Sequence, residues 1–297
     1  MRAKPEHHHY LISLYQTVSI VALVAGILVF CCTMAAVAVK IQVYAYADEN
    51  RLHFFTVQSN LLSAVGAAFM IPFAIQGIRQ KRFVLPRWLV VFQYAGATCV
   101  AITLMTSMLL ILPVEGSTAV TGTDFWLHLV APLCTITLYQ CVETDIVLER
   151  RDTVIAQIPF WIYMIVYYIE VVVIGKANGG WSDFYKVTAY LPAWISILLM
   201  LAVGFGVASL LRVIHNRCTS LYRNRITRHW GDDMDPVELR IEAFGLGRYT
   251  GAHCDANDLV IPVEIFTLMA ERFDVTIDEL TTAFVKGAMD AMKERQA

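Results

Sequence analysis

The sequence predicts an all-α integral membrane protein with six transmembrane helices, cytoplasmic N- and C-termini, and a small helical C-terminal cytoplasmic domain. Of its 297 residues, 57% are hydrophobic and only 16% are charged, whereas soluble domains carry roughly 25% charged residues. A helix needs about 20 apolar residues to cross the hydrocarbon of a bilayer, and six segments of the chain are long enough. These segments lack the alternating pattern of barrel strands, which are the other structure that spans lipid.

The six predicted spans are long segments with few charges. They cover residues 15–39, 54–78, 88–113, 125–146, 153–174 and 189–214. The first is far longer than the roughly 7–15-residue apolar core of a signal peptide, so we expect it to be retained. The fourth and fifth are the least uniform, because they contain His128, Glu143, Asp145 and Glu170.

The distribution of Lys and Arg predicts the orientation. Basic residues gather between spans 2 and 3, between spans 4 and 5, and after span 6, whereas the loop between spans 3 and 4 has none. Because basic loops remain in the cytoplasm, both termini are expected there. Thr56 and His128 then lie within about one helical turn of the outer ends of spans 2 and 4, at 1.5 Å per residue.

The chain is therefore divided into two parts. Residues 1–215 form the six-helix transmembrane domain, and residues 216–297 form a basic juxtamembrane segment and an acidic helical cytoplasmic tail. From residue 232 onward the tail has fourteen acidic and six basic residues. We expect helices starting at Pro236, Pro262 and Thr276, with Gly245 ending the first, a loop over 245–251, and Phe273 ending the second. Such a domain would serve assembly or regulation.

Two polar stripes lie within the predicted spans. Thr56, Ser59, Asn60 and Ser63 share one helical face because they are spaced by three or four residues. Span 4 carries a second set near one face, namely His128, Pro132, Thr135, Tyr139 and Glu143. Polar groups in hydrocarbon usually face the bundle interior, so we expect the stripes to face each other. Hydrogen bonding between helices is the favoured role for Ser59, Ser63 and Thr135, and it remains an alternative for Asn60.

Thr56 and His128 are the candidate catalytic residues. A threonine hydroxyl needs a base before it can act as a nucleophile, and histidine is the usual base near neutral pH. His128 is the only histidine in the six predicted spans; the alternative role is an interfacial histidine bonded to a loop carbonyl. Donors to an oxyanion would come from a backbone N–H or from Asn60, Ser59 or Gln58. An acid that orients the base would be Asp124 or Glu170.

Residues of other spans are expected to border the same site. Thr103, Thr106 and Ser107 lie at matching depth in span 3 and would line a shared cavity with Thr56. Several outer residues either form its mouth or belong to the aromatic belt of a membrane interface. These are Trp126, Trp181, Asp183, Tyr185, Tyr190 and Trp194.

At these residues the chain resembles a known family. Phe-Thr-x-x-Ser-Asn at residues 55–60 and His-x-x-x-Pro at residues 128–132 are similar to motifs of the androgen-induced-protein family. That family includes the androgen-dependent regulator of tissue factor pathway inhibitor and bacterial six-span relatives. The resemblance covers about residues 15–215 and implies an integral-membrane hydrolase of fatty acid esters of hydroxy fatty acids. It implies that Thr56 is the nucleophile and His128 the base.

The expected substrate is a lipid or another amphipathic ester in a bacterial plasma membrane. Hydrolysis and acyl transfer to a lipid hydroxyl would use the same residues, so both remain open. No metal or organic cofactor is implied, and a net charge of -2 argues against a nucleic-acid partner. The competing class is a transporter, channel or scaffold, but the sequence has no convincing internal repeat of the kind common in transporters.

Overall fold

The computed structural model describes most of the chain. The described residues are 5–44, 51–80, 85–116, 121–142, 146–185, 187–188, 191–229, 236–253, 259, 261, 263–272 and 275–296. All regular secondary structure in them is helical. They divide into two compact units, which we describe separately. One comprises Ala22–Pro72 and Leu85–Cys218, and the other comprises Met1–Val21, Phe73–Val84 and Thr219–Ala297.

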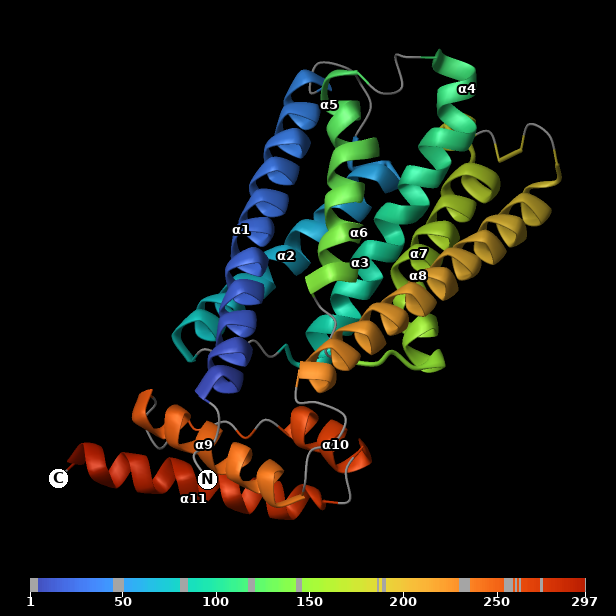
Figure 1. The fold of residues 1–297 in the computed structure, drawn as a ribbon. Helices are drawn as coiled ribbons and strands as arrows, with labels where there is room; N and C mark the ends of the chain where they lie inside the picture. Colours follow the sequence, from blue (N-terminus) through green and yellow to red (C-terminus); the bar gives the residue numbers. More distant parts are fainter. Residues whose placement is uncertain are drawn as a thin grey trace. The chain divides into compact units, whose positions relative to one another are not determined.

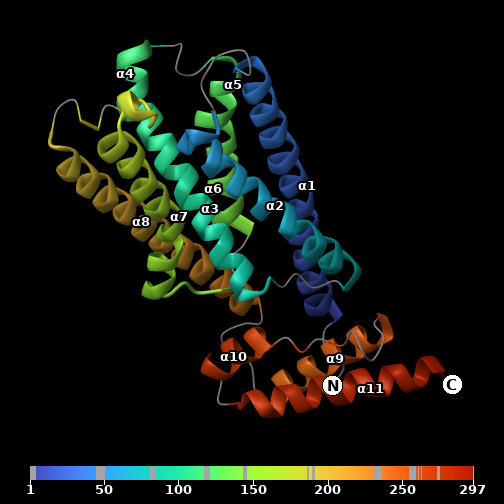
Figure 2. The same ribbon diagram turned by 180° about the vertical axis from the view of Figure 1, so that it is seen from behind.

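Long helices dominate the described chain (Figures 1 and 2). They are α1 Pro5–Tyr44, α2 Phe55–Gln80, α3 Arg87–Thr106, α6 Ala131–Val142, α7 Arg150–Tyr168 and α8 Ala193–His229. The predicted division after residue 215 falls inside α8, which continues without interruption to His229. The helix is therefore longer than the apolar segment that predicts it.

Five helical segments in the described residues are long and apolar enough to cross a membrane. They are Gln16–Gln42, Phe55–Arg79, Arg87–Leu109, Arg150–Ile174 and Ala193–Leu221. They correspond to predicted spans 1, 2, 3, 5 and 6. Predicted span 4 is described as three consecutive shorter elements, which are α5 Gly122–Phe125, a π-helical segment and α6. Glu143 and Asp145, at the end of that span, lie outside the described residues.

Helix α3 occupies the centre of its unit. It packs against α6 and α7, and every residue from Gln93 to Thr103 is buried. Large apolar side chains of the surrounding helices remain exposed, and Ile165 and Leu210 retain 61% and 60% of their surface. Soluble proteins rarely expose apolar surface on this scale, so these outward faces are suited to contact with lipid.

Three π-helical segments continue α-helices of this unit. They are η2 Ser107–Ile111 after α3, η4 Trp126–Val130 before α6, and η5 Ile169–Ile174 after α7. In a π turn the backbone bonds from residue i to i+5, and such turns are rare and often occur at functional sites. Segment η4 contains His128, and η2 begins at Ser107.

The C-terminal helices are α9 Pro236–His253, α10 Val263–Arg272 and α11 Ile277–Gln296. Their apolar core is formed by Leu239, Ala243, Phe266, Met269, Val275, Leu280 and Phe284. The predicted starts of α9 and α11 are confirmed. Within the described residues α10 also matches its prediction, although the predicted ends Pro262 and Phe273 lie outside them.

The prediction that Gly245 ends the first of these helices is wrong, as is the predicted loop over 245–251. Helix α9 continues through both, because its glycines serve contact with α11. A Cβ atom at Gly247 would collide with the carbonyl oxygen of Phe284, and one at Gly251 would collide with that of Ala288. The glycines therefore let two helix backbones approach closely, as small residues do in tightly packed helix pairs.

Candidate active site

Thr56 and His128 lie side by side, although 72 positions separate them in the sequence. The Oγ1 atom of Thr56 is 3.3 Å from the Nε2 atom of His128. Thr56 lies in the first turn of α2 and retains 8% exposure, and His128 lies in η4 and retains 7%. The separation is slightly longer than a typical hydrogen bond, which is common in catalytic pairs before a substrate is bound.

Asn60 fixes the relative position of the two segments. Its Nδ2 group donates one hydrogen bond to the carbonyl oxygen of Thr56, at 2.7 Å, and another to that of Leu127, at 3.0 Å. These bonds join the residue before His128 to the backbone of the candidate nucleophile. Because an amide nitrogen has two protons, both are in use. Asn60 therefore holds the site together and has no proton left for an oxyanion.

The remaining stripe residues connect helices. Ser59 Oγ donates to the Thr56 carbonyl at 3.1 Å and lies 2.8 Å from Thr103 Oγ1. Ser63 Oγ lies 2.7 Å from Thr135 Oγ1. The two polar stripes therefore do face each other. Both serines join α2 to neighbouring helices, which is the role favoured for them.

Gln58 does not face the Thr56–His128 pair. Its Nε2 group donates to the carbonyl oxygen of Leu52 at 2.8 Å, and this contact is exposed. The side chain thus supports the turn before α2. The structure offers no geometry in which Gln58 would donate to an oxyanion at Thr56.

Neither of the two acids expected to orient His128 makes a hydrogen bond with it among the described residues. Asp124 forms an ion pair with Lys40 of α1. Glu170 lies in η5, and among the described residues its carboxylate makes no hydrogen bond with His128. The Asp124 contact instead links the end of α1 to the start of the segment that contains the histidine.

Tyr185 reaches the site from the segment between α7 and α8. The backbone N–H of Phe55 donates to its phenolic oxygen at 3.1 Å, and Tyr185 and Thr56 line one cavity. The first N–H groups of a helix have no partner within the helix, so Tyr185 caps α2 beside the candidate nucleophile. Burial raises the pKa of Tyr185 to about 12, which keeps its proton in place at neutral pH.

Asp183 holds the Tyr185 segment in place. Its carboxylate accepts hydrogen bonds from the Tyr167 hydroxyl at 2.8 Å, from Val187 N at 2.9 Å, and from the N and Oγ1 atoms of Thr188 at 2.8 and 2.6 Å. Partial burial acts to raise the pKa of Asp183, but these hydrogen bonds outweigh it and hold the pKa below its usual value. The acid is thus ionised and anchors the loop.

Aromatic stacking adds to this anchoring. Trp181 stacks on His53 with ring centroids 4.4 Å apart, and Phe184 lies 4.5 Å from Phe54. The segment therefore packs against the residues that precede α2. The sequence predicted that Trp181, Asp183 and Tyr185 lie at the mouth of the site or in an aromatic belt. Tyr190, for which the prediction was the same, lies outside the described residues. The sequence did not indicate that Tyr185 would cap α2 and line a cavity with Thr56.

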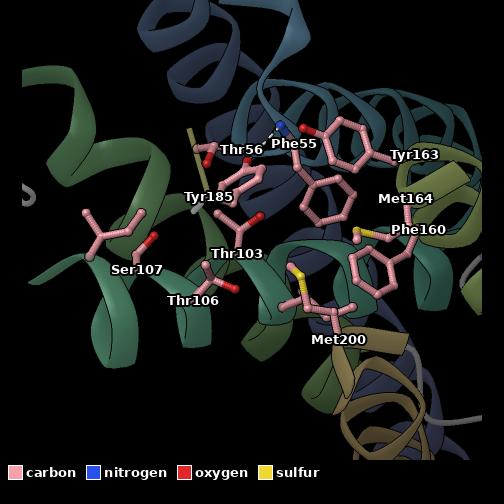
Figure 3. Close-up of a pocket in the computed structure, with 12 residues that line it drawn as sticks. Phe55, Thr56, Thr103, Thr106, Ser107, Phe160, Tyr163, Met164, Tyr185 and Met200 are labelled. Carbon is pink, nitrogen blue, oxygen red and sulfur yellow. Dashed lines mark hydrogen bonds between the residues drawn. The ribbon is translucent and has the colours of Figure 1, made fainter. Parts of the chain in front are cut away.

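A cavity of about 20 Å³ lies beside Thr56 (Figure 3). Thr103, Thr106 and Ser107 line it together with Thr56, which confirms that these hydroxyls share one cavity. Its other lining residues are Phe55, Ile102, Ile111, Phe160, Tyr163, Met164, Tyr185 and Met200. The cavity thus has a row of hydroxyls within an otherwise largely apolar and aromatic wall.

A second buried histidine lies elsewhere in the same unit. The apolar segment Ala193–Leu221 includes His215, so the prediction that His128 is the only histidine in a span is wrong. His215 is fully buried, its Nε2 donates to the Ile146 carbonyl at 2.9 Å, and its ring stacks on Tyr139 with centroids 4.8 Å apart. It was missed because the predicted span ends at residue 214.

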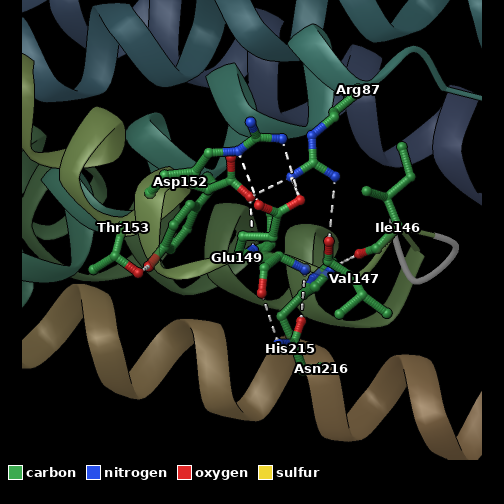
Figure 4. A network of polar contacts seen from close by, with 11 residues as sticks. Arg87, Ile146, Val147, Glu149, Asp152, Thr153, His215 and Asn216 are labelled. Carbon is green, nitrogen blue, oxygen red and sulfur yellow. Dashed lines mark hydrogen bonds and ion pairs between the residues drawn. The ribbon is translucent and has the colours of Figure 1, made fainter.

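His215 lies beside a network of ion pairs and hydrogen bonds (Figure 4). Arg87 binds the carboxylates of Asp152 and Glu149 at 2.6 and 3.2 Å. Asn216 makes two hydrogen bonds with the backbone of Leu148. Its Oδ1 accepts from the Leu148 N–H at 2.9 Å, and its Nδ2 donates to the Leu148 carbonyl at 3.0 Å. These contacts secure the start of α7 against α3 and α8.

Among the described residues, no three His, Cys, Asp or Glu side chains are grouped so that they could hold a metal ion. A comparison of the chain with protein-family models, with curated proteins and with solved structures finds no match.

Proposed function

We propose that this chain is an intramembrane hydrolase of lipid esters that uses Thr56 as nucleophile and His128 as base. One observation carries the proposal: the buried hydroxyl of a threonine that lines a cavity lies 3.3 Å from a buried imidazole nitrogen. A weak nucleophile within reach of a base is the arrangement that covalent acyl transfer requires. Six spans, cytoplasmic termini, a bacterial plasma membrane and kinship with the androgen-induced-protein family belong to the same proposal.

The reaction follows from the positions of the two side chains. Neutral His128, protonated at Nδ1, accepts the Thr56 proton at Nε2 as Oγ1 attacks the ester carbonyl carbon. The resulting imidazolium then protonates the leaving alcohol oxygen, and the acyl group remains as an ester of Thr56. Water completes the cycle by hydrolysing this ester, with His128 again acting as base.

Tyr185 is the proposed oxyanion donor. Its phenolic oxygen already accepts the Phe55 N–H, so its own proton is directed to another acceptor. The phenol also belongs to a residue that lines the same cavity as Thr56, where a tetrahedral intermediate would form. A fixed donor at the developing negative charge stabilises the transition state more than the substrate. Tyr185 thus takes the role that the sequence suggested for Asn60 or Gln58.

The surroundings of the site favour an amphipathic ester as substrate. Thr56 lies in the first turn of an apolar helix, and Phe160, Met164 and Met200 line the adjacent cavity. The cavity is smaller than an acyl chain requires, so entry of a chain must displace side chains. The two methionines are suited to this because they are unbranched and adapt readily to a new neighbour.

Active-site labelling tests the proposal directly. Detergent-purified protein is treated with a fluorophosphonate probe, and the adduct is mapped by mass spectrometry. The wild-type protein should be labelled at Thr56, because His128 increases the nucleophilicity of its hydroxyl. Thr56→Ala and His128→Gln should each lose the label while the helical circular dichroism and thermal unfolding stay close to wild type.

Matched controls come from the network around His215. Thr153 and His215 are also a buried threonine and a buried histidine, and Tyr94 and Ile146 respectively hold them in structural contacts. Thr153→Ala and His215→Gln should keep the label. A folded wild-type protein that takes up no probe at Thr56, or a Thr56→Ala variant labelled as strongly as wild type, would contradict the assignment.

A further inference from the structure

Ser107 is a buried hydroxyl with no partner. It retains 1% exposure, and its Oγ atom makes no hydrogen bond. A buried polar group without a partner loses its hydrogen bonds to water and gains none in return, so such groups are few and usually have a cause. Ser107 also begins the π segment η2 and lines the cavity beside Thr56. The serine whose oxygen has no partner therefore lies at the cavity beside Thr56.

The size and lining of the cavity match one water molecule. A water needs at least about 10–15 Å³ and two to four polar partners, and the cavity offers about 20 Å³. Four of the residues that line it carry hydroxyls, namely Thr56, Thr103, Thr106 and Ser107. Thr103 Oγ1 is also held 2.8 Å from Ser59 Oγ, which fixes one of these hydroxyls in place.

We propose that this cavity is the site of the hydrolytic water, with Ser107 as the residue that positions it. The inference rests on the proposed function and adds to it the step that separates hydrolysis from acyl transfer. After Thr56 is acylated, the chain takes the space from which the two methionines have moved, and the carbonyl carbon lies next to a water that is still bonded to Ser107. An alcohol of a second lipid would have to displace that water before it could accept the acyl group.

The step is balanced by residues already present. The water oxygen bonds to the acyl carbonyl carbon, and a water proton passes to His128 Nε2. The bond between that carbon and Thr56 Oγ1 then breaks, and Oγ1 takes the proton from Nε2. The products are a free fatty acid and the original Thr56–His128 pair. No oxidant, reductant or metal takes part.

Pre-steady-state kinetics with a 4-nitrophenyl ester of a medium-chain fatty acid separates the two half-reactions. The burst of nitrophenolate reports acylation of Thr56, and the steady rate reports deacylation. Ser107→Ala should keep the burst rate within about twofold and slow deacylation about tenfold, the effect expected from one lost hydrogen bond of about 1.4 kcal/mol. Intact-mass analysis should then show acyl-enzyme accumulating.

Two further variants make the result specific. Thr98 is another buried α3 hydroxyl without a partner, but it does not line the cavity. Thr98→Val should leave both half-reactions unchanged, and Ser107→Thr, which keeps a hydroxyl, should restore much of the deacylation rate.

The outcomes separate this inference from the proposed function. Deacylation at the wild-type rate in Ser107→Ala, or equal slowing in Thr98→Val, overturns the water site while Thr56 acylation still supports the enzyme. Equal loss of burst and steady rate in folded Ser107→Ala also overturns it, because the serine would then act before deacylation. Absence of any acyl-Thr56 in the wild-type protein overturns both proposals.

Discussion

Two buried histidines of the same helical unit occupy contrasting surroundings. His215 donates to the Ile146 carbonyl and stacks on Tyr139, beside carboxylates that are paired with Arg87. His128 instead faces the hydroxyl of Thr56 next to a cavity. The comparison teaches that burial of a histidine alone does not indicate catalysis. What distinguishes His128 is a reactive neighbour together with space for a reactant.

The two surroundings lie at different levels along α3. Arg87 begins this helix and Thr103 follows sixteen residues later, which corresponds to about 24 Å at 1.5 Å per residue. Near Arg87 the ionised side chains are paired with one another. Near Thr103 a hydroxyl without a partner remains at Ser107. We interpret the first region as structural and the second as reactive.

The largest expected effect comes from exchanging each histidine for glutamine. His128→Gln should lower ester turnover about 10³-fold or more, because it removes the base of the nucleophile. His215→Gln should keep kcat within about twofold and lower the stability by about 1–2 kcal/mol, because it alters one buried hydrogen bond. Turnover and thermal unfolding of both variants check this. Equal loss of turnover in the two variants would contradict the distinction between a catalytic His128 and a structural His215.

Tyr185→Phe should have the next largest effect. Loss of one oxyanion donor typically lowers kcat about 10²–10³-fold, and KM should change little because the ring remains. Tyr94→Phe is the matched control, since it removes a phenol that donates to the Ala208 carbonyl at 2.6 Å in the structural region. A Tyr185→Phe enzyme with near-wild-type kcat would leave the phenol only its capping role.

Asp152→Ala should affect stability without affecting chemistry. The carboxylate is buried, binds Arg87 at 2.6 Å and accepts from the Glu149 N–H at 2.7 Å, so it closes the capping box of α7. Loss of the cap and the ion pair should cost about 2–3 kcal/mol. Denaturant or thermal unfolding measures this cost. A large fall in kcat with unchanged stability would show that the two regions are coupled.

The smallest expected effect is a pH dependence of the Tyr185 segment. Hydrogen bonds hold the pKa of Asp183 below its usual value. The contribution of Asp183 to stability is therefore complete above the ordinary aspartate pKa of about 3.9. It is lost as pH falls through the lower pKa that Asp183 has in the folded protein. The loss should be under about 1 kcal/mol because the group is only partly buried and solvent screens its charge.

Trp181 fluorescence and hydrogen exchange over residues 183–188 measure this change. Asp183→Asn should show the acid-like signal at neutral pH and no titration below pH 5. The network around Arg87 provides the internal reference, because its hydrogen exchange should not follow that titration.

The expected six-span topology predicted that Thr56 and His128 lie at one depth and left a contact between them open, and the structure shows that contact. Their matching depth in span 3 likewise predicted that Thr103, Thr106 and Ser107 line a cavity with Thr56. Tyr185 could not be found in this way, because its position depends on how a loop folds back through Asp183 and Trp181. The roles of Asn60 and Gln58 depended on side-chain orientation, which periodicity does not specify. Gly247 and Gly251 misled the prediction because glycine suits both a helix end and close helix packing.

The π segment around His128 gives chain length a direct influence on the reactive geometry. A π turn holds about one residue more than the α turn it replaces, so η4 is equivalent to a one-residue insertion before α6. Deleting a residue there would restore regular spacing and turn the preceding side chains by about 100° relative to α6. Such a deletion would keep both Thr56 and His128 but would move the His128 imidazole away from the Thr56 hydroxyl. The site can therefore be gained or lost through a single codon inserted or removed, without a change in any reacting group.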